Sequence, residues 1–352
     1  MHRIVVWNVG RLLRPTGSTL ARALDATAAD GWNRTTYNEK IAAVAAVLRA
    51  ACPDGPPAVL ALVEVQDASV VRDITQATGW SGMVDVAPAD EQVSGYDVAI
   101  AYDSGQVAGH REAASYSIGN RYSTRDILDV TLEVGRGQTV RIVNVHWASR
   151  SMSDAEPLRI AAAWFCNELV SRAMKFPKED LFDRTGKTRM PARQTLAKRW
   201  QSPLVVLGDF NDNPWDTSVR LVGGATYDRT TATRPPRLPA SRGKSGVASY
   251  LSLRPRLFNP TWALPTTEAP PGTIHYANDW HLLDQMLLSP GLLGDTGPRY
   301  VNGSLHVFAP RAVPFGAGAR RITNPNRTPL AFNATKHEGA SDHLPLIADF
   351  EW

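Results

Sequence analysis

Polar side chains that can bind a metal ion or move a proton come directly after apolar runs of the sequence. Asn8 ends the first run, Glu64 ends the second, and His146 follows a third. Asp209 and Asn211 come after a fourth. Side chains at the ends of strands in one sheet converge in space, and loops at strand ends are where α/β folds place their sites. The sequence therefore predicts one cleft in which carboxylate, amide and imidazole groups meet.

Each of these residues also has an ordinary structural interpretation. Asn8 and the Gly-Asp-Phe-Asn segment at 208–211 have residue types that are common in turns. Glu64 can end a strand at the surface, and Ser341-Asp342-His343 can cap a helix or begin a strand. The coincidence of all these placements favours a functional site over several unrelated turns.

The elements that must position these residues are short apolar runs bounded by turn residues. We expect buried strands at 4–7, 59–63, 98–101, 140–145, 204–207 and 344–348. Capping-box patterns at 36–39 and 153–156 each precede apolar residues at helical spacing and predict two amphipathic helices. Strands and helices alternate early and strands dominate the middle, which predicts mixed sheets with helices packed outside.

Three stretches rich in Arg, Pro, Gly or Thr interrupt this pattern, at 175–200, 224–278 and 310–340. We interpret them as loop elaborations of a single domain spanning 1–352. The first two contain much of the positive charge, and solvated surface is the simplest interpretation of such runs. The net charge of +4 and the charged fraction of 20% exclude the basic field of a chromatin-coating protein, so any attraction to polyanions must be local.

The bulk composition is that of an ordinary globular protein. With 352 residues and 43% hydrophobic content, the chain can bury a substantial core. Cys52 and Cys166 are not in a metal-binding spacing, and Met1-His2-Arg3 leads straight into a strand without the zones of a signal peptide. No apolar run reaches the length of a membrane span. These features predict a cytoplasmic location, with no membrane partner and no obligate protein partner.

Six segments occur in the order and rough spacing of the endonuclease/exonuclease/phosphatase superfamily, which the chain resembles from end to end. They are Trp7-Asn8, Val63-Glu64, Asn144-x-His146, 208–211, Leu283-Asp284-Gln285-Met286-Leu287 and Ser341-Asp342-His343. The resemblance implies an α+β fold in four layers, an α/β/β/α sandwich of two packed mixed β-sheets flanked by helices, with a cleft along one edge. Neither a Walker-type glycine loop nor a His-rich two-metal cluster is found in the sequence.

The resemblance also implies roles for individual residues. Glu64 and Asp342 would hold a divalent metal ion, with Asn8 nearby. A hard cation held by few carboxylates and several waters is Mg²⁺ chemistry, with Mn²⁺ as a substitute. Asp209 and Asn211 would position the attacking water, and Asp209 is one candidate for its base.

Histidines complete the implied catalytic set. His343 would donate to the phosphate or act as the base, held in one tautomer by Asp284, with a raised pKa. His146 would protonate the leaving oxygen, as a histidine can in the relatives closest to pancreatic deoxyribonuclease and phosphodiesterases. Its carboxylate partner is open among Glu91, Asp97 and Glu112. We interpret His275, His281 and His337 as structural residues.

Two further residues are candidates for substrate binding. Asn144 points to the same face as His146, two residues away, so we expect it to share the site. Arg125 resembles a phosphate-contacting arginine of some relatives, although an exposed structural arginine is an equally good interpretation. Trp147 and Trp215 follow site segments directly and can either stack on bases or belong to the core.

The predicted function is therefore divalent-metal-dependent hydrolysis of phosphodiester bonds by in-line attack of water, with DNA or RNA as the expected substrate. One alternative is a phosphatase or phosphodiesterase acting on a small molecule such as an inositol phosphate or a nucleotide. A second is a binding module that has lost catalysis. The second is disfavoured because a competent residue fills every expected position.

Overall fold

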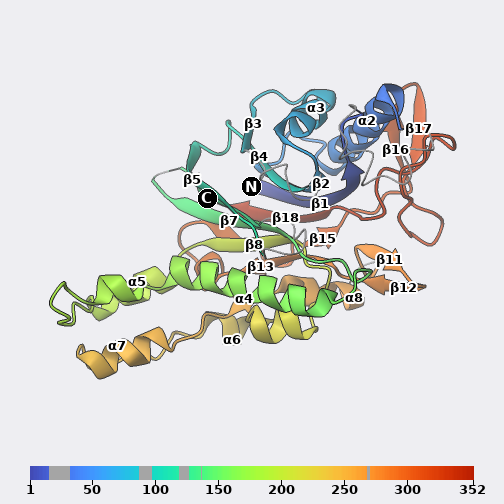
Figure 1. Ribbon diagram of the computed structural model, residues 1–352. Helices are drawn as coiled ribbons and strands as arrows, with labels where there is room; N and C mark the ends of the chain where they lie inside the picture. Colours follow the sequence, from blue (N-terminus) through green and yellow to red (C-terminus); the bar gives the residue numbers. More distant parts are fainter. Residues whose placement is uncertain (16–31, 87–96, 119–126, 136, 268–269) are drawn as a thin grey trace.

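Two β-sheets pack face to face at the centre of the protein (Figure 1). The computed structural model describes residues 1–15, 32–86, 97–118, 127–135, 137–267 and 270–352. In spatial order the first sheet contains β14 (Arg299–Tyr300), β18 (Leu346–Glu351), β1 (His2–Leu12), β2 (Val59–Val65), β4 (Asp97–Asp103) and β3 (Met83–Val86), with β15 (His306–Val307) also paired to β18. The second contains β5 (Gly109–Tyr116), β6 (Ile127–Glu133), β7 (Thr139–His146), β8 (Leu204–Asp209), β13 (Asp284–Leu288), β10 (Leu257–Phe258) and β9 (Ala225–Thr226).

Both sheets mix parallel and antiparallel pairs. β1 runs parallel to β2, and β7 runs parallel to β8, whereas β1 and β18 are antiparallel. Val6 and Ile100 of the first sheet meet Ile142 and Leu207 of the second in the central core. These strands are buried on both faces, so they are continuous apolar runs in the sequence.

Helices cover the outer face of each sheet. α2 (Arg34–Ala51) and α3 (Ala68–Thr78) share a core with the first sheet, and α4 (Ala155–Met174) packs on the second. The predicted α+β fold, an α/β/β/α sandwich, is therefore confirmed. No helix in the described part of the chain combines the length and the apolar character needed to cross a membrane.

Both capping-box predictions were wrong in detail, although both helices exist. α2 begins earlier than expected: Asn33 is its N-cap, and its side chain accepts hydrogen bonds from the backbone N–H groups of Thr35 and Thr36. Asp154 precedes α4 in a left-handed conformation (φ 57°) and forms no capping hydrogen bond. A sequence box identifies a helix more reliably than it identifies the first residue, because nearby polar residues compete for the same backbone donors.

The stretches interpreted as loops contain short elements of their own. They are η2 (Lys178–Leu181), α5 (Arg193–Trp200), α6 (Arg229–Thr233), α7 (Lys244–Leu251), η4 (Pro260–Ala263), α8 (Leu264–Thr267), β11 (Ile274–Tyr276), β16 (Ala312–Phe315) and β17 (Gly318–Arg321). Outside these stretches lie η3 (Ser218–Val222), β12 (Asp279–His281) and η5 (Pro290–Leu292). Cys52 and Cys166 are both free and buried.

Asn144 joins the two sheets. Its side chain is fully buried, and its Nδ2 donates to the carbonyl oxygens of Leu62 (3.0 Å) and Ala99 (2.9 Å) in the first sheet. Asn144 does lie on the same face of β7 as His146, but its amide points between the sheets. The structure thus gives it an architectural contact in place of the expected role in substrate binding.

We expect Asn144→Leu to lower the free energy of unfolding by roughly 1–3 kcal/mol, because two buried carbonyls lose a donor. Urea titration at neutral pH would measure this loss. Asn326→Leu is a suitable control, because Asn326 is exposed. Equal unfolding free energies for the two variants would show that the contact between the sheets contributes nothing.

Candidate active site

The ends of strands from both sheets meet at one edge of the sandwich. Asn8 lies opposite Val63 in the register of β1 and β2, directly before Glu64. In the second sheet, Asp209 lies opposite both His146 of β7 and Asp284 of β13. The register of the two sheets therefore brings polar residues far apart in the sequence to one place.

Asn8 connects the carboxylates of the two sheets. Its Nδ2 donates to Asp209 Oδ2 (3.0 Å) and to Glu64 Oε1 (3.3 Å), while its Oδ1 accepts from the N–H of Gly10 (3.0 Å). The side chain is 1% exposed, so its orientation is fixed by these contacts. Asn8 thus orients the two carboxylates instead of serving only as a turn former.

The backbone around Asp209 is shaped for a close approach of strands. Gly208 has φ +131°, and a Cβ there would lie 2.1 Å from the carbonyl oxygen of Val145. Asn211 adopts a left-handed conformation (φ 51°), which lets its N–H donate to Asp209 Oδ1 (2.8 Å). In the Gly-Asp-Phe-Asn segment, backbone geometry therefore favours glycine and asparagine at the first and last positions, in addition to the role of the side chains.

Burial raises the pKa of the Asp209 carboxyl to about 6. The nearby His343 opposes this shift and the Asp284 carboxylate adds to it, while hydrogen bonds from Asn211 and Asn8 oppose it. His343 Nε2 lies 3.9 Å from Asp209 Oδ2. A carboxylate with a pKa in this range can accept a proton near neutral pH.

His343 is held by a buried carboxylate. Its Nδ1 lies 2.7 Å from Asp284 Oδ2. Its backbone N–H donates to Ser341 Oγ (3.1 Å), and its backbone carbonyl accepts from Trp7 Nε1 (2.9 Å). Burial lowers the pKa of His343, but Asp284 above all, then Asp209 and Asp342, raise it well above the ordinary value. The surrounding carboxylates therefore favour the protonated imidazole.

His146 lies between two carboxylates. Its Nε2 is 3.6 Å from Glu64 Oε1 and 3.7 Å from Asp209 Oδ2, and its side chain is buried. Sequence reasoning had assigned Glu64 to the metal alone and therefore missed this contact. The signal was available, since Glu64 and His146 both end central strands.

The three carboxylates considered as partners of His146 differ in position. Glu112 is the wrong candidate, because it is exposed and far along the sheet from His146. It lies opposite Thr131 of β6, which lies opposite Arg141 of β7, five residues before His146. Asp97 begins β4 opposite Val65 and is buried at the same sheet edge as Glu64. Glu91, like Arg125, lies outside the described residues.

Glu64 and Asp342 flank one backbone turn. Glu64 has φ 63°, and its Oε2 accepts from the N–H of Arg11 (2.7 Å). The exposed Asp342 approaches the neighbouring Gly10, where a Cβ would lie 3.2 Å from Asp342 Oδ1. Carboxylate oxygens at a partly open edge are ligands of the kind that a hydrated Mg²⁺ or Mn²⁺ ion prefers.

A second group could also hold an ion by geometry alone. Ligand atoms of Asp209, Asp284 and His343 lie within 4.8 Å of one another, and all three side chains are buried. The imidazole is already hydrogen-bonded to Asp284, and the surrounding carboxylates raise its pKa, which opposes a second positive charge.

Asn211 and the two tryptophans lie beside this centre. Asn211 Nδ2 donates to the carbonyl of Trp147 (3.0 Å), which ties the ends of β7 and β8 together. Trp147 is buried and packs edge-on against Phe210 at 4.7 Å, so it belongs to the core. Trp215 is 44% exposed and contacts Trp262 at 5.8 Å.

Arg150 is a residue of this region that sequence reasoning missed. Its Nε donates to the carbonyl of Asn211 (2.9 Å), and its Nη2 donates to Asp216 Oδ2 (2.5 Å). Its Nη1 also lies 3.5 Å from His281 Nδ1. Nothing in the sequence except its position shortly after His146 marks this arginine, because its partners are brought together only by the fold.

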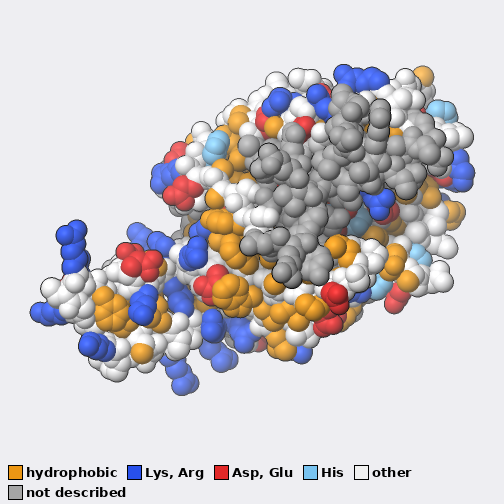
Figure 2. Space-filling view, viewed as in Figure 1, with side chains coloured by type: hydrophobic (Ala, Val, Ile, Leu, Met, Phe, Trp, Pro, Cys, Tyr) orange, Lys and Arg blue, Asp and Glu red, His pale blue; other side chains and the backbone are white. Residues whose placement is uncertain are grey.

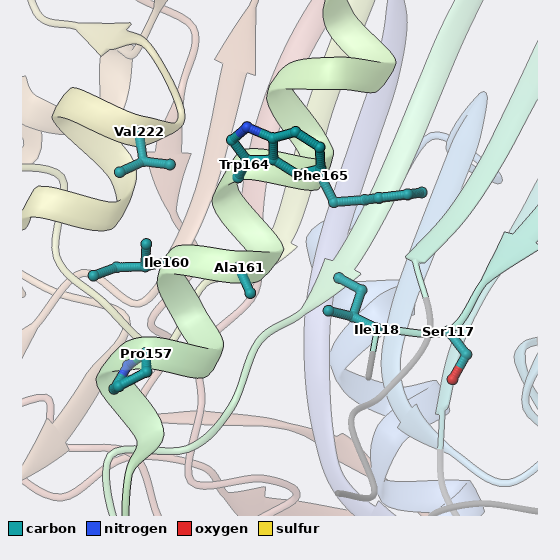
Figure 3. Close-up of a pocket in the computed structure, with 8 residues that line it drawn as sticks. All are labelled: Ser117, Ile118, Pro157, Ile160, Ala161, Trp164, Phe165 and Val222. Atoms are coloured by element: carbon teal, nitrogen blue, oxygen red, sulfur yellow. The ribbon is translucent and has the colours of Figure 1, made fainter. Parts of the chain in front are cut away.

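A large apolar cavity is lined by none of these residues (Figure 3). Its volume is about 760 Å³, and it is lined by Ser117, Ile118, Pro157, Ile160, Ala161, Trp164, Phe165 and Val222. None of these side chains is a carboxylate or an imidazole. The cavity therefore does not provide the chemistry found at the strand ends.

Four layers of helices and sheets, with acidic and histidine side chains at one edge, define a phosphoesterase-type fold. A model of the Endonuclease/Exonuclease/phosphatase family matches residues 18–180 and 239–351, and the chain belongs to this family. Its members are metal-dependent phosphoesterases. The unmatched stretch, 181–238, includes β8 and Asp209.

Solved structures show the same fold at low sequence identity. D. rerio TDP2 complexed with single strand DNA product is 13% identical, with a TM-score of 0.53, over 100% of this chain and 99% of that one. Mannosyl-6-phosphatase Bt3783 of Bacteroides thetaiotaomicron VPI-5482 is 12% identical, with a TM-score of 0.55, over 100% of both chains. No curated protein sequence matches the chain. At these identities the comparisons define the fold.

Proposed function

We propose that the protein is a divalent-metal-dependent hydrolase of phosphodiester bonds that acts on DNA or RNA. The observation that carries this proposal is the buried Asp284–His343 pair beside Asp209, joined through Asn8 to Glu64. This arrangement offers a base, a cationic donor and a metal-binding edge within one site.

Glu64 and Asp342 would hold the metal ion, with Asn8 beside them, and the bound ion would withdraw charge from a phosphoryl oxygen. Mg²⁺ is the expected ion and Mn²⁺ a substitute. Nε2 of His343 would donate to a phosphate oxygen, where negative charge accumulates in the transition state. Asp284 keeps the proton on His343 by accepting from Nδ1.

Asp209 would accept the proton of the attacking water, and Asn211 would fix the position of this carboxylate through its N–H. His146 would supply a proton to the leaving oxygen from its position between the Glu64 and Asp209 carboxylates. Arg125 remains a candidate for phosphate binding. The reaction then needs water, one phosphodiester bond and no other reactant.

A nucleic-acid substrate is supported by the structure of TDP2, which has a single-stranded DNA product bound. The alternative, hydrolysis of a small phosphate ester, is supported by the similar structure of a mannosyl-6-phosphatase. Both substrates present the same phosphoryl group to the site, so the surrounding surface must select between them.

We expect the protein to nick supercoiled plasmid or cut single-stranded DNA or RNA in Mg²⁺, to lose this activity in EDTA and to regain it when Mg²⁺ is restored. Gel assays of the three nucleic acids and phosphate release from inositol and sugar phosphates would be measured side by side. Asp342→Asn should need a higher Mg²⁺ concentration for half-maximal rate. Phosphate release without any cleavage of nucleic acid would replace the nuclease proposal with the phosphatase one.

A further inference from the structure

Two segments distant in the sequence form a projection, which we call the basic arm: residues 175–200 and 234–256. Figure 1 shows α5 of the first segment and α7 of the second extending past one end of the sheets. The arm has a small core of its own, built from Leu181, Met190, Leu196, Leu238, Val247 and Tyr250. Lys175 Nζ also donates to the carbonyls of Leu251 (2.7 Å) and Leu253 (2.9 Å). The two segments therefore fold together around a shared core and are not separate solvated loops.

The positive charge of the protein is concentrated in this arm. It contains fourteen Lys and Arg residues but three Asp and Glu residues, a formal charge of +11, whereas the whole chain carries +4. Among the described residues, no carboxylate forms an ion pair with any cation of the arm, and most of these cations are exposed. Figure 2 shows Lys and Arg side chains projecting from the arm in several directions. Positive charge that is not neutralised internally attracts a polyanion.

α4 connects the arm to the active site. Near its start, Arg159 Nε lies 2.7 Å from Asp212 Oδ2, in the loop that follows Asp209. Its last residue, Met174, directly precedes the arm. The helix has 20 residues, so at 1.5 Å per residue the arm begins about 30 Å from the start of α4.

We propose that the basic arm binds the phosphate backbone of a polynucleotide whose scissile bond lies in the active site. This inference rests on the proposed nuclease function and adds a substrate class to it, namely chains long enough to reach both places. Nine of the fourteen cations are Arg, whose guanidinium groups can bind phosphate oxygens in pairs. With about 3.4 Å of duplex axis per base pair, the length of α4, about 30 Å, corresponds to about nine base pairs.

Part of the arm lies outside the matched family ranges. Residues 181–200 and the start of the second segment, up to 238, lie in the stretch that the family model does not match. Specificity for long substrates would then be a property added to a common catalytic site. A small phosphodiester would not reach the arm and would be hydrolysed without its help.

The test compares two triple variants that remove equal charge. The arm variant is Arg184→Gln/Lys187→Gln/Arg193→Gln, and the control variant is Arg34→Gln/Arg311→Gln/Lys336→Gln; all six side chains are exposed and none forms an ion pair with a described carboxylate. Binding to a 30-base-pair DNA duplex and to a six-base-pair hairpin would be measured by fluorescence anisotropy in EDTA, across a range of KCl. Binding to phosphatidylserine vesicles and hydrolysis of bis-p-nitrophenyl phosphate in Mg²⁺ complete the set.

We expect the arm variant to bind the long duplex roughly tenfold more weakly, with the slope of log affinity against log salt reduced by about one for each lost phosphate contact. Binding of the hairpin and hydrolysis of the small diester should not change, and the control variant should match the unmodified protein. Equal weakening by both variants, equal effects on both DNA lengths, or vesicle binding in place of duplex binding would overturn the proposal. Because binding is measured in EDTA, a failure of the nuclease proposal in the cleavage assays is seen separately.

Discussion

Asp209→Asn is expected to lower kcat for phosphodiester cleavage by about 10²- to 10⁴-fold, the range for loss of a positioned general base. The amide keeps the size of the carboxylate but cannot accept the proton of the attacking water. Burial raises the pKa of Asp209 to about 6, so cleavage by the unmodified protein should also decrease as the pH falls through 6 and this carboxylate becomes protonated. Cleavage rates of a labelled oligonucleotide from pH 5 to 8 would measure both effects.

Asp209→Asn should lower the activity but should not lower the thermal stability at neutral or higher pH. A carboxyl group whose pKa is raised by folding binds its proton more tightly in the folded state. Its contribution therefore favours folding below the ordinary value of 3.8 and is lost as the pH rises through about 6. At pH 7.5 Asp209→Asn should unfold at the same or a higher temperature than the unmodified protein. The exposed Asp295→Asn is the matched control, and retention of full activity by Asp209→Asn would remove Asp209 from the mechanism.

The meeting of the candidate residues at one sheet edge was predictable because they end strands that are buried on both faces. Apolar runs such as 59–63 and 204–207 are continuous, so the first polar residue after each one marks the sheet edge. Contacts between the two sheets at that edge were harder to predict from the sequence. The approach of His146 to Glu64 depends on how the two sheets stack, and Asn144 was misjudged for the same reason.

The elaborations were the least predictable part of the fold. Residues 175–200 have no clear periodicity, because their apolar side chains pack against a segment that lies 52 to 74 residues later in the sequence. Tyr250 Oη accepts a hydrogen bond from the N–H of Phe176 (2.9 Å), and Arg242 Nε donates to the carbonyl of Met190 (3.0 Å). Local sequence patterns cannot show such long-range pairing. A stretch with many Arg and Lys residues therefore has the same appearance in the sequence as a solvated loop.

Asp284→Asn should lower kcat by about 10²- to 10⁴-fold through its effect on His343. The buried carboxylate is the main cause of the raised pKa of His343, and burial alone would lower that pKa. Without Asp284, we expect the imidazole to lose its proton at a lower pH, which weakens its contact with a phosphate oxygen. Titration of the His343 ring signals by NMR would measure the change, with the exposed Asp54→Asn as the control.

The pH dependence of stability gives an independent measure of the same pair. A histidine whose pKa is raised by folding stabilises the folded state fully below its unfolded value of 6.5, and this contribution is lost as the pH rises through the folded value. The difference in unfolding free energy between the unmodified protein and Asp284→Asn should therefore be largest below pH 6.5 and shrink in alkaline solution. A constant difference across this range, together with unchanged ring signals of His343, would mean that Asp284 does not hold the proton on this imidazole. Both measurements are made on the protein without substrate. They therefore test the Asp284–His343 pair whether the substrate is a nucleic acid or a small phosphate ester.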